Sequence, residues 1–207
     1  MPHDEPPLTG AKITSIGAPV GEPRLVLGCR APVNDAPRLE VVACASFPRH
    51  EVSRLHDQAA AFRIGDPGAF ENVLDIARAA LAGEAGRVLG TRTVAVAIPV
   101  HLAGARNRPC EHLVEALAAD VPGLVAGTGA LLRIADAPEA RDAATRDPAA
   151  EAATLRWNAD LIPAGADRIL LVDDVVRTGS TFTAAALAAP PAVRSRLAAL
   201  AIFRAEG

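Results

Sequence analysis

Two adjacent carboxylates and a turn rich in hydroxyl groups follow one short apolar run of the chain. Asp173 and Asp174 come directly after Ile169–Val172, and a second polar group follows them at Thr178, Gly179, Ser180 and Thr181. Paired carboxylates accept hydrogen bonds from neighbouring hydroxyls of a sugar. A Gly-, Ser- and Thr-rich turn before a helix can hold a phosphate through backbone N–H groups, hydroxyls and the positive end of the helix. Together the two groups predict a site for a ribose 5-phosphate.

The apolar run indicates how these residues are positioned. Ile169–Val172 is continuous rather than alternating, which is typical of a strand buried on both faces of a parallel sheet. Ligands of such sheets bind beyond the carboxyl ends of the strands. We therefore expect Asp173 and Asp174 at the end of a buried strand, facing a ligand. A plain helix N-cap with solvated acids is the alternative, although a cap needs one Ser or Thr and no paired acids.

A second candidate segment follows the predicted strand Val94–Ile98. It contains small residues, Val100, His101, and the two arginines Arg106 and Arg108. Guanidinium groups at this place can neutralise the charge of an anionic ligand. An ordinary basic surface loop is the alternative for the arginines, and a structural role is the alternative for His101.

The run from Asp173 to Thr181 resembles the binding motif for 5-phosphoribosyl 1-diphosphate (PRPP) of the type I phosphoribosyltransferases, over a core of about residues 92 to 204. The resemblance implies that Asp173 and Asp174 hold the ribose hydroxyls and that Thr178–Thr181 hold the 5′-phosphate. It places the diphosphate near Val100, His101, Arg106 and Arg108. It also implies Mg²⁺, held by Asp173 and Asp174 through ribose hydroxyls or water. Arg177 departs from the small hydroxyl residue common at its place in the family.

A long polar stretch, residues 133–148, stands where the family has a mobile loop that closes over bound PRPP. By this resemblance Arg141 and Arg146 are expected to contact the diphosphate on closure, and they join Asp173 and Asp174 as candidate catalytic residues. A lid suits the chemistry because a reactive ribosyl centre must be shielded from water. A solvated helix is the alternative, since Asp142 and Arg146 are four residues apart.

Three further segments resemble the ComF-like members of the family: Ile98-Pro99-Val100-His101, Arg106-Asn107-Arg108 and Arg156-Trp157-Asn158. The family's Gly-Phe-Asn-Gln element and its paired N-terminal cysteines are missing. The interpretations are a phosphoribosyltransferase acting on an unidentified nitrogen acceptor, and a catalytically silent PRPP-binding regulatory or ComF-like DNA-uptake accessory protein. A third is an unrelated α/β domain whose acids bind a metal or another phosphate compound.

The order of apolar runs predicts an α/β fold with a mostly parallel sheet flanked by helices, a type I phosphoribosyltransferase-like, Rossmann-like core. We expect a core at residues 91–207 and an N-terminal cap at residues 1–90, continuous with the core and built over the carboxyl ends of its strands. Strands are predicted at 24–29, 39–45, 94–98, 131–134, 169–172 and 197–203. Helices are predicted at 50–62, 70–81 and 111–119, and from about Thr181 to Pro190.

Composition limits the partners. The 207 residues are 50% hydrophobic and carry a net charge of -3, so direct nucleic-acid binding is not expected. No apolar stretch reaches the ~18 residues of a membrane span. We expect a cytoplasmic protein whose partners are PRPP and a small-molecule acceptor, and a homodimer is an open alternative for its assembly. The three cysteines lack metal-ligand spacing, and Cys110 is the one near enough to the predicted site to be tested for reactivity.

Overall fold

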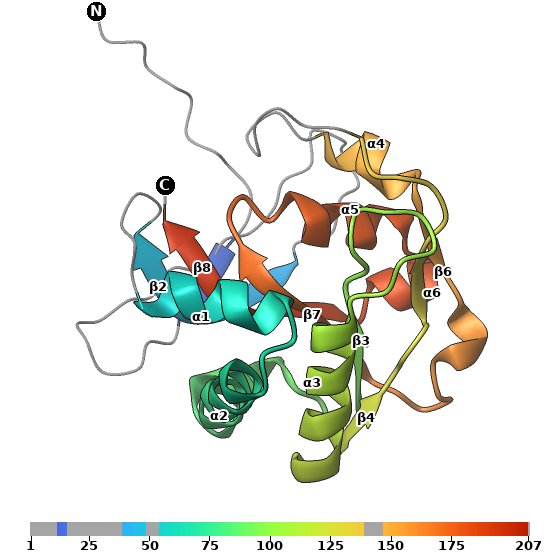
Figure 1. The fold of residues 1–207 in the computed structure, drawn as a ribbon. Helices are drawn as coiled ribbons and strands as arrows, with labels where there is room; N and C mark the ends of the chain where they lie inside the picture. The colour runs from blue at the N-terminus through green and yellow to red at the C-terminus, as the bar shows by residue number, and fades with distance from the viewer. Residues whose placement is uncertain (1–11, 16–38, 49–53, 139–146, 207) are drawn as a thin grey trace, which may run out of the picture.

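A six-stranded parallel sheet forms the centre of the protein (Figure 1). The computed structural model describes residues 12–15, 39–48, 54–138 and 147–206. Across the sheet the strands are β1 (Lys12–Ser15), β2 (Glu40–Pro48), β8 (Leu197–Glu206), β7 (Arg168–Val176), β3 (Thr93–Ala97) and β4 (Leu124–Ala126). Every neighbouring pair runs parallel. The predicted α/β class, with a parallel sheet flanked by helices, is confirmed.

Helices cover both faces of this sheet. One face carries α1 (Arg54–Arg63), α2 (Pro67–Ala82) and α3 (Arg108–Asp120), and the other carries α5 (Ser180–Ala188) and α6 (Pro191–Arg194). Within β7, Leu170 and Val172 pack on the first face, while Ile169 and Leu171 pack on the second. Burial on both faces explains why the strand reads as a continuous apolar run. In the described part of the chain, no helix combines the length and the apolar character needed to cross a membrane.

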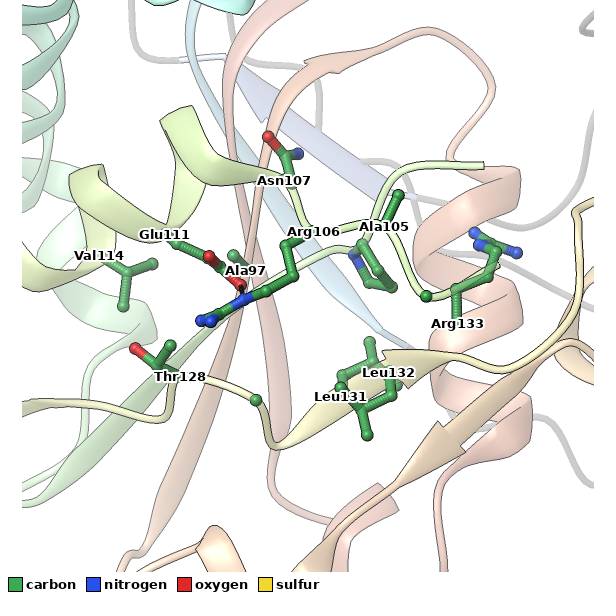
Figure 2. Close-up of a pocket in the computed structure, with 13 residues that line it drawn as sticks. Ala97, Ala105, Arg106, Asn107, Glu111, Val114, Thr128, Leu131, Leu132 and Arg133 are labelled. Atoms are coloured by element: carbon green, nitrogen blue, oxygen red, sulfur yellow. Dashed lines mark hydrogen bonds and ion pairs between the residues drawn. The ribbon is translucent and has the colours of Figure 1, made fainter. Parts of the chain in front are cut away.

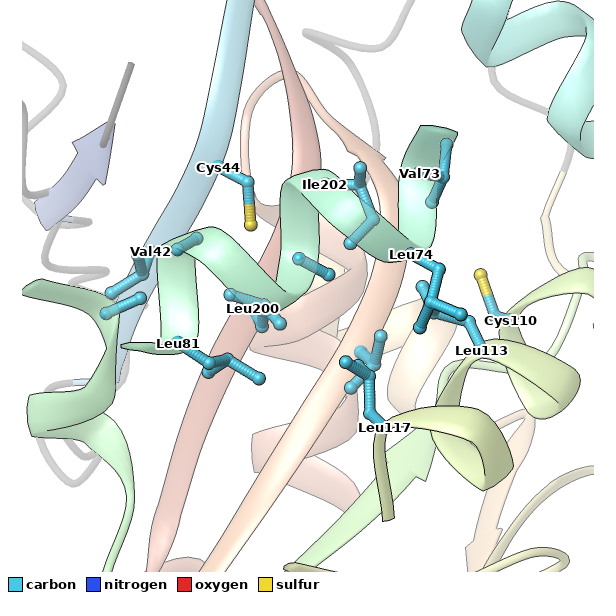
Figure 3. Packing of buried hydrophobic residues seen from close by; sticks show 14 of the residues in the cluster. Val42, Cys44, Val73, Leu74, Leu81, Cys110, Leu113, Leu117, Leu200 and Ile202 are labelled. Atoms are coloured by element: carbon cyan, nitrogen blue, oxygen red, sulfur yellow. The ribbon is translucent and has the colours of Figure 1, made fainter. Parts of the chain in front are cut away.

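The core on the α1–α3 face contains two of the three cysteines. Cys44 of β2 and Cys110 of α3 lie among apolar side chains of β2, β8, α2 and α3 (Figure 3). Burial raises the pKa of Cys44 to about 12. Burial also raises the pKa of Cys110 well above its usual value, and the charges of Asp173 and Asp174 raise it further. Both the complete burial of Cys110 and its raised pKa oppose formation of the thiolate, which is the reactive form.

One strand was predicted in the wrong place. The segment predicted as a sheet strand at 131–134 forms β5 (Leu131–Arg133), which pairs antiparallel with β6 (Leu155–Trp157) in a separate two-stranded sheet. The strand beside β3 on the side away from β7 is β4, an edge strand whose three residues are too few to show a hydrophobic period. Trp157 anchors the small sheet on the α5 face by donating from Nε1 to the carbonyl oxygen of Ala185 at 2.9 Å. The remaining short elements are η1 (Glu84–Val88), α4 (Pro148–Ala152) and η3 (Ala159–Leu161).

The described residues before position 90 belong to the same sheet and core as those after it. β2 pairs with β8 from Val41 opposite Ala199 to Pro48 opposite Glu206, and α1 and α2 pack in one cluster with α3. β2, α1 and α2 are therefore part of the sheet and its core. The strand predicted at 24–29 lies outside the described residues, and a domain boundary near residue 90 stays a prediction.

Candidate functional site

The topology of the sheet creates a crevice between β3 and β7. These strands are neighbours, yet β3 continues into α3 on one face and β7 continues into α5 on the opposite face. The segments that follow the two strands therefore separate, and ligands of open α/β sheets bind at such a switch point beyond the carboxyl ends of the strands. A cleft of about 600 Å³ lies at this place and is lined by the residues that follow both strands.

The cleft brings together most of the residues predicted for the site. It is lined by Val100, His101, Arg106, Arg108, Asp173, Asp174, Thr178, Gly179, Ser180 and Thr181. Arg141 and Arg146 fall within residues 139–146, outside the described residues, so the lid and their role in it stay predictions. The cleft is also lined by Arg63, Arg133 and Glu151, which were not predicted.

The paired acids lie inside β7 rather than after it. The strand was predicted to end at Val172, but it continues to Val176 because β8 runs beside it, with Asp173 opposite Ala201 and Val175 opposite Phe203. On its other side the pairing with β3 stops at Val172, which lies opposite Ala97. On the side of β7 that faces β3, Asp173 and Asp174 therefore have no strand partner among the described residues.

Arg63 pairs with Asp174 across the cleft. Arg63 is the last residue of α1, and its Nε and Nη2 donate to the two carboxylate oxygens of Asp174, with 3.3 Å between Nη2 and Oδ1. The carboxylate of Asp174 also accepts a hydrogen bond from the backbone N–H of Val175 at 2.8 Å. The two partners are 111 residues apart in the sequence, so no local pattern could have indicated the pair.

Asp173 lies in a different electrostatic environment from its neighbour. Burial raises the pKa of Asp173 well above the usual carboxylate range, and the negative charge of Asp174 raises it further. The backbone N–H of Asp174 donates to Asp173 Oδ1 at 3.0 Å and opposes part of this rise. Asp173 therefore holds a proton more tightly than an exposed aspartate does.

The turn after β7 has the backbone that the phosphate-site prediction requires. Gly179 has φ 78°, a left-handed conformation that a glycine adopts without steric cost. Ser180 begins α5, and the hydroxyl oxygens of Thr178 and Ser180 are 2.7 Å apart. Gly179, the N-cap residue of α5, makes no side-chain cap hydrogen bond, and the backbone N–H of Ser180 donates to Thr178 Oγ1 at a long 3.4 Å. The other first-turn N–H groups of α5 and the two hydroxyls can bind an anion in the cleft.

The arginines after β3 contact a carboxylate of the protein itself. Arg106 donates from Nε to Glu111 Oε1 at 2.6 Å, and Nη1 of Arg108 lies 3.8 Å from Glu111 Oε2. Figure 2 shows the side chain of Arg106 directed toward Glu111 on α3. The side chain of Arg108 is more exposed than that of Arg106, at 63% against 38%, so Arg108 is the freer of the two to bind an anion. Glu111 was predicted only as a helix residue, and its contact with these arginines was not predicted.

Arg133 fixes the segment after β3 from the other side of the cleft. It donates from Nε to the carbonyl oxygen of Val100 at 2.8 Å, from Nη1 to Thr154 Oγ1 at 2.6 Å, and from Nη2 to Glu151 Oε1 at 3.1 Å. The backbone N–H of Gly104 donates to the carbonyl oxygen of Arg133 at 2.9 Å. Arg133 was not predicted as a site residue, although a single arginine within the apolar run 131–134 is a sequence signal for a buried charge.

The side chains of the described residues do not form a metal site by themselves. Among them, no group of three or more His, Cys, Asp and Glu side chains is placed to bind an ion. Mg²⁺ requires about six oxygen ligands and commonly takes several from water and from phosphate groups. Asp173 and Asp174 fit that ion only if a ligand or water supplies the other oxygens.

Comparison with known proteins adds no assignment. The chain matches no protein-family model and no curated protein. The resemblance to the type I phosphoribosyltransferases therefore rests on the residues of the cleft, and the function inferred from them is a proposal.

Proposed function

We propose that this chain is a phosphoribosyltransferase that binds Mg²⁺-PRPP and transfers phosphoribosyl to a nitrogen of a small-molecule acceptor, with release of diphosphate. The observation that carries the proposal is that one cleft is lined both by Asp173 and Asp174 and by the turn Thr178–Thr181. A ribose 5-phosphate requires acceptors for its hydroxyls and donors for its phosphate close to each other. The resemblance of this run to the PRPP motif supports the same reading.

Each part of PRPP has a candidate partner in the cleft. The 5′-phosphate accepts hydrogen bonds from the first turn of α5 and from the hydroxyls of Thr178 and Ser180, close to the backbone of Gly179. The ribose hydroxyls donate to Asp173 and Asp174. The diphosphate lies near the segment from Val100 to Arg108, where the exposed side chain of Arg108 lines the cleft.

The proposed reaction requires charge stabilisation at two places. As the acceptor nitrogen forms its bond to C1, the bond from C1 to the diphosphate oxygen breaks, so positive charge develops on the ribose ring and negative charge on the leaving group. Asp173 and Asp174 stabilise the first by their proximity to the ring, and Arg108 stabilises the second. Bound Mg²⁺ supplies further neutralisation of the diphosphate. Arg141 and Arg146, within the stretch 133–148 where the lid is predicted, lie outside the described residues, and a lid that excludes water is part of the proposal.

A PRPP-binding regulatory or ComF-like accessory protein without turnover is the second candidate. The observation that favours it is that two arginines lining the cleft are paired with carboxylates of the chain itself, Arg63 with Asp174 and Arg106 with Glu111. In that arrangement less positive charge is available for a leaving diphosphate. Sensing requires PRPP affinity, whereas turnover requires an acceptor and a diphosphate that can leave.

Diphosphate release separates the two candidates. The full chain is incubated with Mg²⁺-PRPP and a panel of nucleobases and other nitrogen acceptors, and free diphosphate is measured. We expect release that depends on one class of acceptor and that is lost in the Asp173→Asn, Asp174→Asn double variant. Binding of PRPP without release for any acceptor would favour the regulatory candidate. Absence of PRPP binding would contradict both.

A further inference from the structure

Arg63 competes with any ligand that uses Asp174. Its two donors engage both oxygens of one carboxylate, which is the geometry of the strongest Arg–carboxylate pairs. Residue Asp174 is 7% exposed, whereas the side chain of Arg63 is 57% exposed and lines the cleft. The carboxylate of Asp174 is thus largely covered, and the more exposed Arg63 is its paired cation at the cleft.

Three of the roughly four acceptor positions of this carboxylate are taken, two by Arg63 and one by Val175. Because little of Asp174 is exposed, a hydroxyl that donates to it competes with the N–H groups of Arg63. Displacement leaves a buried carboxylate without its cation and next to a second acid, Asp173. Removing one partner from a buried pair is costly because the remaining charge is not compensated. A ligand that offers hydroxyls alone therefore binds against this cost.

A ligand that also carries a second anion avoids most of the cost. Its anion accepts hydrogen bonds from the displaced guanidinium, which is exposed enough to turn away from Asp174 within the cleft. A metal ion that accompanies the anion compensates the carboxylates in turn. Ribose 5-phosphate and PRPP share the sugar and the 5′-phosphate, and they differ by the diphosphate on C1.

We propose that Arg63 is a specificity-determining residue that makes the ribose site select sugar phosphates with a second anionic group, as in PRPP, over ribose 5-phosphate. The inference rests on the proposed PRPP site. It adds a residue from α1, outside the motif that suggested the site, and it gives that residue a role in choosing the ligand.

The test is the ratio of two dissociation constants, measured by calorimetry on the full chain with Mg²⁺-PRPP and with ribose 5-phosphate plus Mg²⁺. In Arg63→Gln we expect weaker PRPP binding and tighter ribose 5-phosphate binding, so that selectivity falls about tenfold or more, the equivalent of one charge-assisted hydrogen bond. Arg63→Lys keeps the charge but loses the paired donors, and its selectivity should lie between that of the parent and that of Arg63→Gln.

Arg78→Gln is the matched control. Arg78 lies on α2 outside the cleft, pairs with Asp75 and Asp120, and has a 40% exposed side chain. We expect it to retain the selectivity of the parent. Circular dichroism checks the fold of each variant, and Arg63→Lys decides the question if Arg63→Gln does not fold.

Three outcomes would overturn the inference. If the parent binds PRPP and Arg63→Gln keeps the same selectivity, Arg63 has no role in choosing the ligand while the proposed function stands. If Arg63→Gln weakens both ligands equally, Arg63 contacts a group that the two share. If the parent binds neither ligand, the proposed function fails and the inference fails with it.

Discussion

Arg133 and Glu151 form an ion pair inside the protein, with 3.1 Å between Nη2 and Oε1 and side chains that are 1% and 4% exposed. Arg133 also donates to the carbonyl oxygen of Val100. The pair therefore joins β5 and α4 to the segment after β3, which is the proposed diphosphate segment. Among the described residues, the second oxygen of Glu151 is buried without a hydrogen-bond partner.

Loss of one partner of this pair should destabilise the fold strongly. We expect Arg133→Met to lower the free energy of unfolding by about 3–5 kcal/mol, because the charge of Glu151 stays buried without a partner. The double variant Arg133→Met, Glu151→Leu should lose less than the single variant. Urea unfolding measures both, with Arg78→Met as the control for an exposed arginine. A loss for Arg133→Met no larger than that of the control would contradict the burial described for the pair.

The environment of Asp173 predicts a pH dependence of stability. Its pKa is raised in the folded state by burial and by Asp174, so between the ordinary aspartate pKa and the raised value the folded state binds more protons than the unfolded state. Stability must then fall as pH rises through that window. Asp173→Asn removes this term, so the variant should be more stable than the parent at neutral pH and should lose less stability as pH rises.

Thermal unfolding across a pH series measures this effect. Asp160→Asn, at an exposed position in η3, is measured alongside as the control substitution. A parent whose stability rises with pH from the ordinary aspartate range upward, or an Asp173→Asn variant that is less stable at neutral pH, would contradict the environment described for Asp173.

Binding of PRPP at the turn Thr178–Thr181 should depend on the backbone at Gly179 more than on the charge of Arg177. Gly179→Val should abolish PRPP binding, because a β-branched residue is strained at φ 78° and its side chain fills the space next to the phosphate. Arg177→Ala should retain binding, since Arg177 is exposed. Gly165→Val is the control for backbone strain, because Gly165 has φ 82° at an exposed position outside the cleft.

Dissociation constants for Mg²⁺-PRPP and circular dichroism spectra of the three variants test this prediction. A larger loss of affinity in Arg177→Ala than in Gly179→Val would show that side-chain charge holds the phosphate. Equal losses of affinity in Gly165→Val and Gly179→Val would show that strain alone explains the effect.

The parallel sheet could be predicted because its inner strands are buried on both faces. β7 and β8 therefore read as continuous apolar runs, and the runs at Val94–Ile98 and 39–45 marked β3 and β2 in the same way. β4 was missed because a strand of three residues at the sheet edge is too short to show a hydrophobic pattern. The end of β7 was predicted too early because Asp173 and Asp174 are polar, although pairing with β8 extends the strand beyond them.

The site could be predicted where its residues follow one another in the chain. Asp173, Asp174 and the turn Thr178–Thr181 form one local run, and the cleft contains all of them. Arg63 and Glu151 reach the cleft from elements far away in the sequence, so only the packing of α1 and α4 reveals them. The contact between Arg106 and Glu111 was missed for a different reason. Glu111 reads as an ordinary helix residue in the sequence, and only the position of α3 brings it beside that arginine.

The most direct test of the proposed site is a calorimetric titration of the full chain with Mg²⁺-PRPP, set beside the Asp173→Asn, Asp174→Asn double variant. We predict saturable binding at one site in the parent and none in the variant, with circular dichroism showing that the variant remains folded. Binding of equal affinity in both proteins would show that the paired acids do not hold the ribose. Absence of binding in the parent would contradict the assignment of this cleft to PRPP.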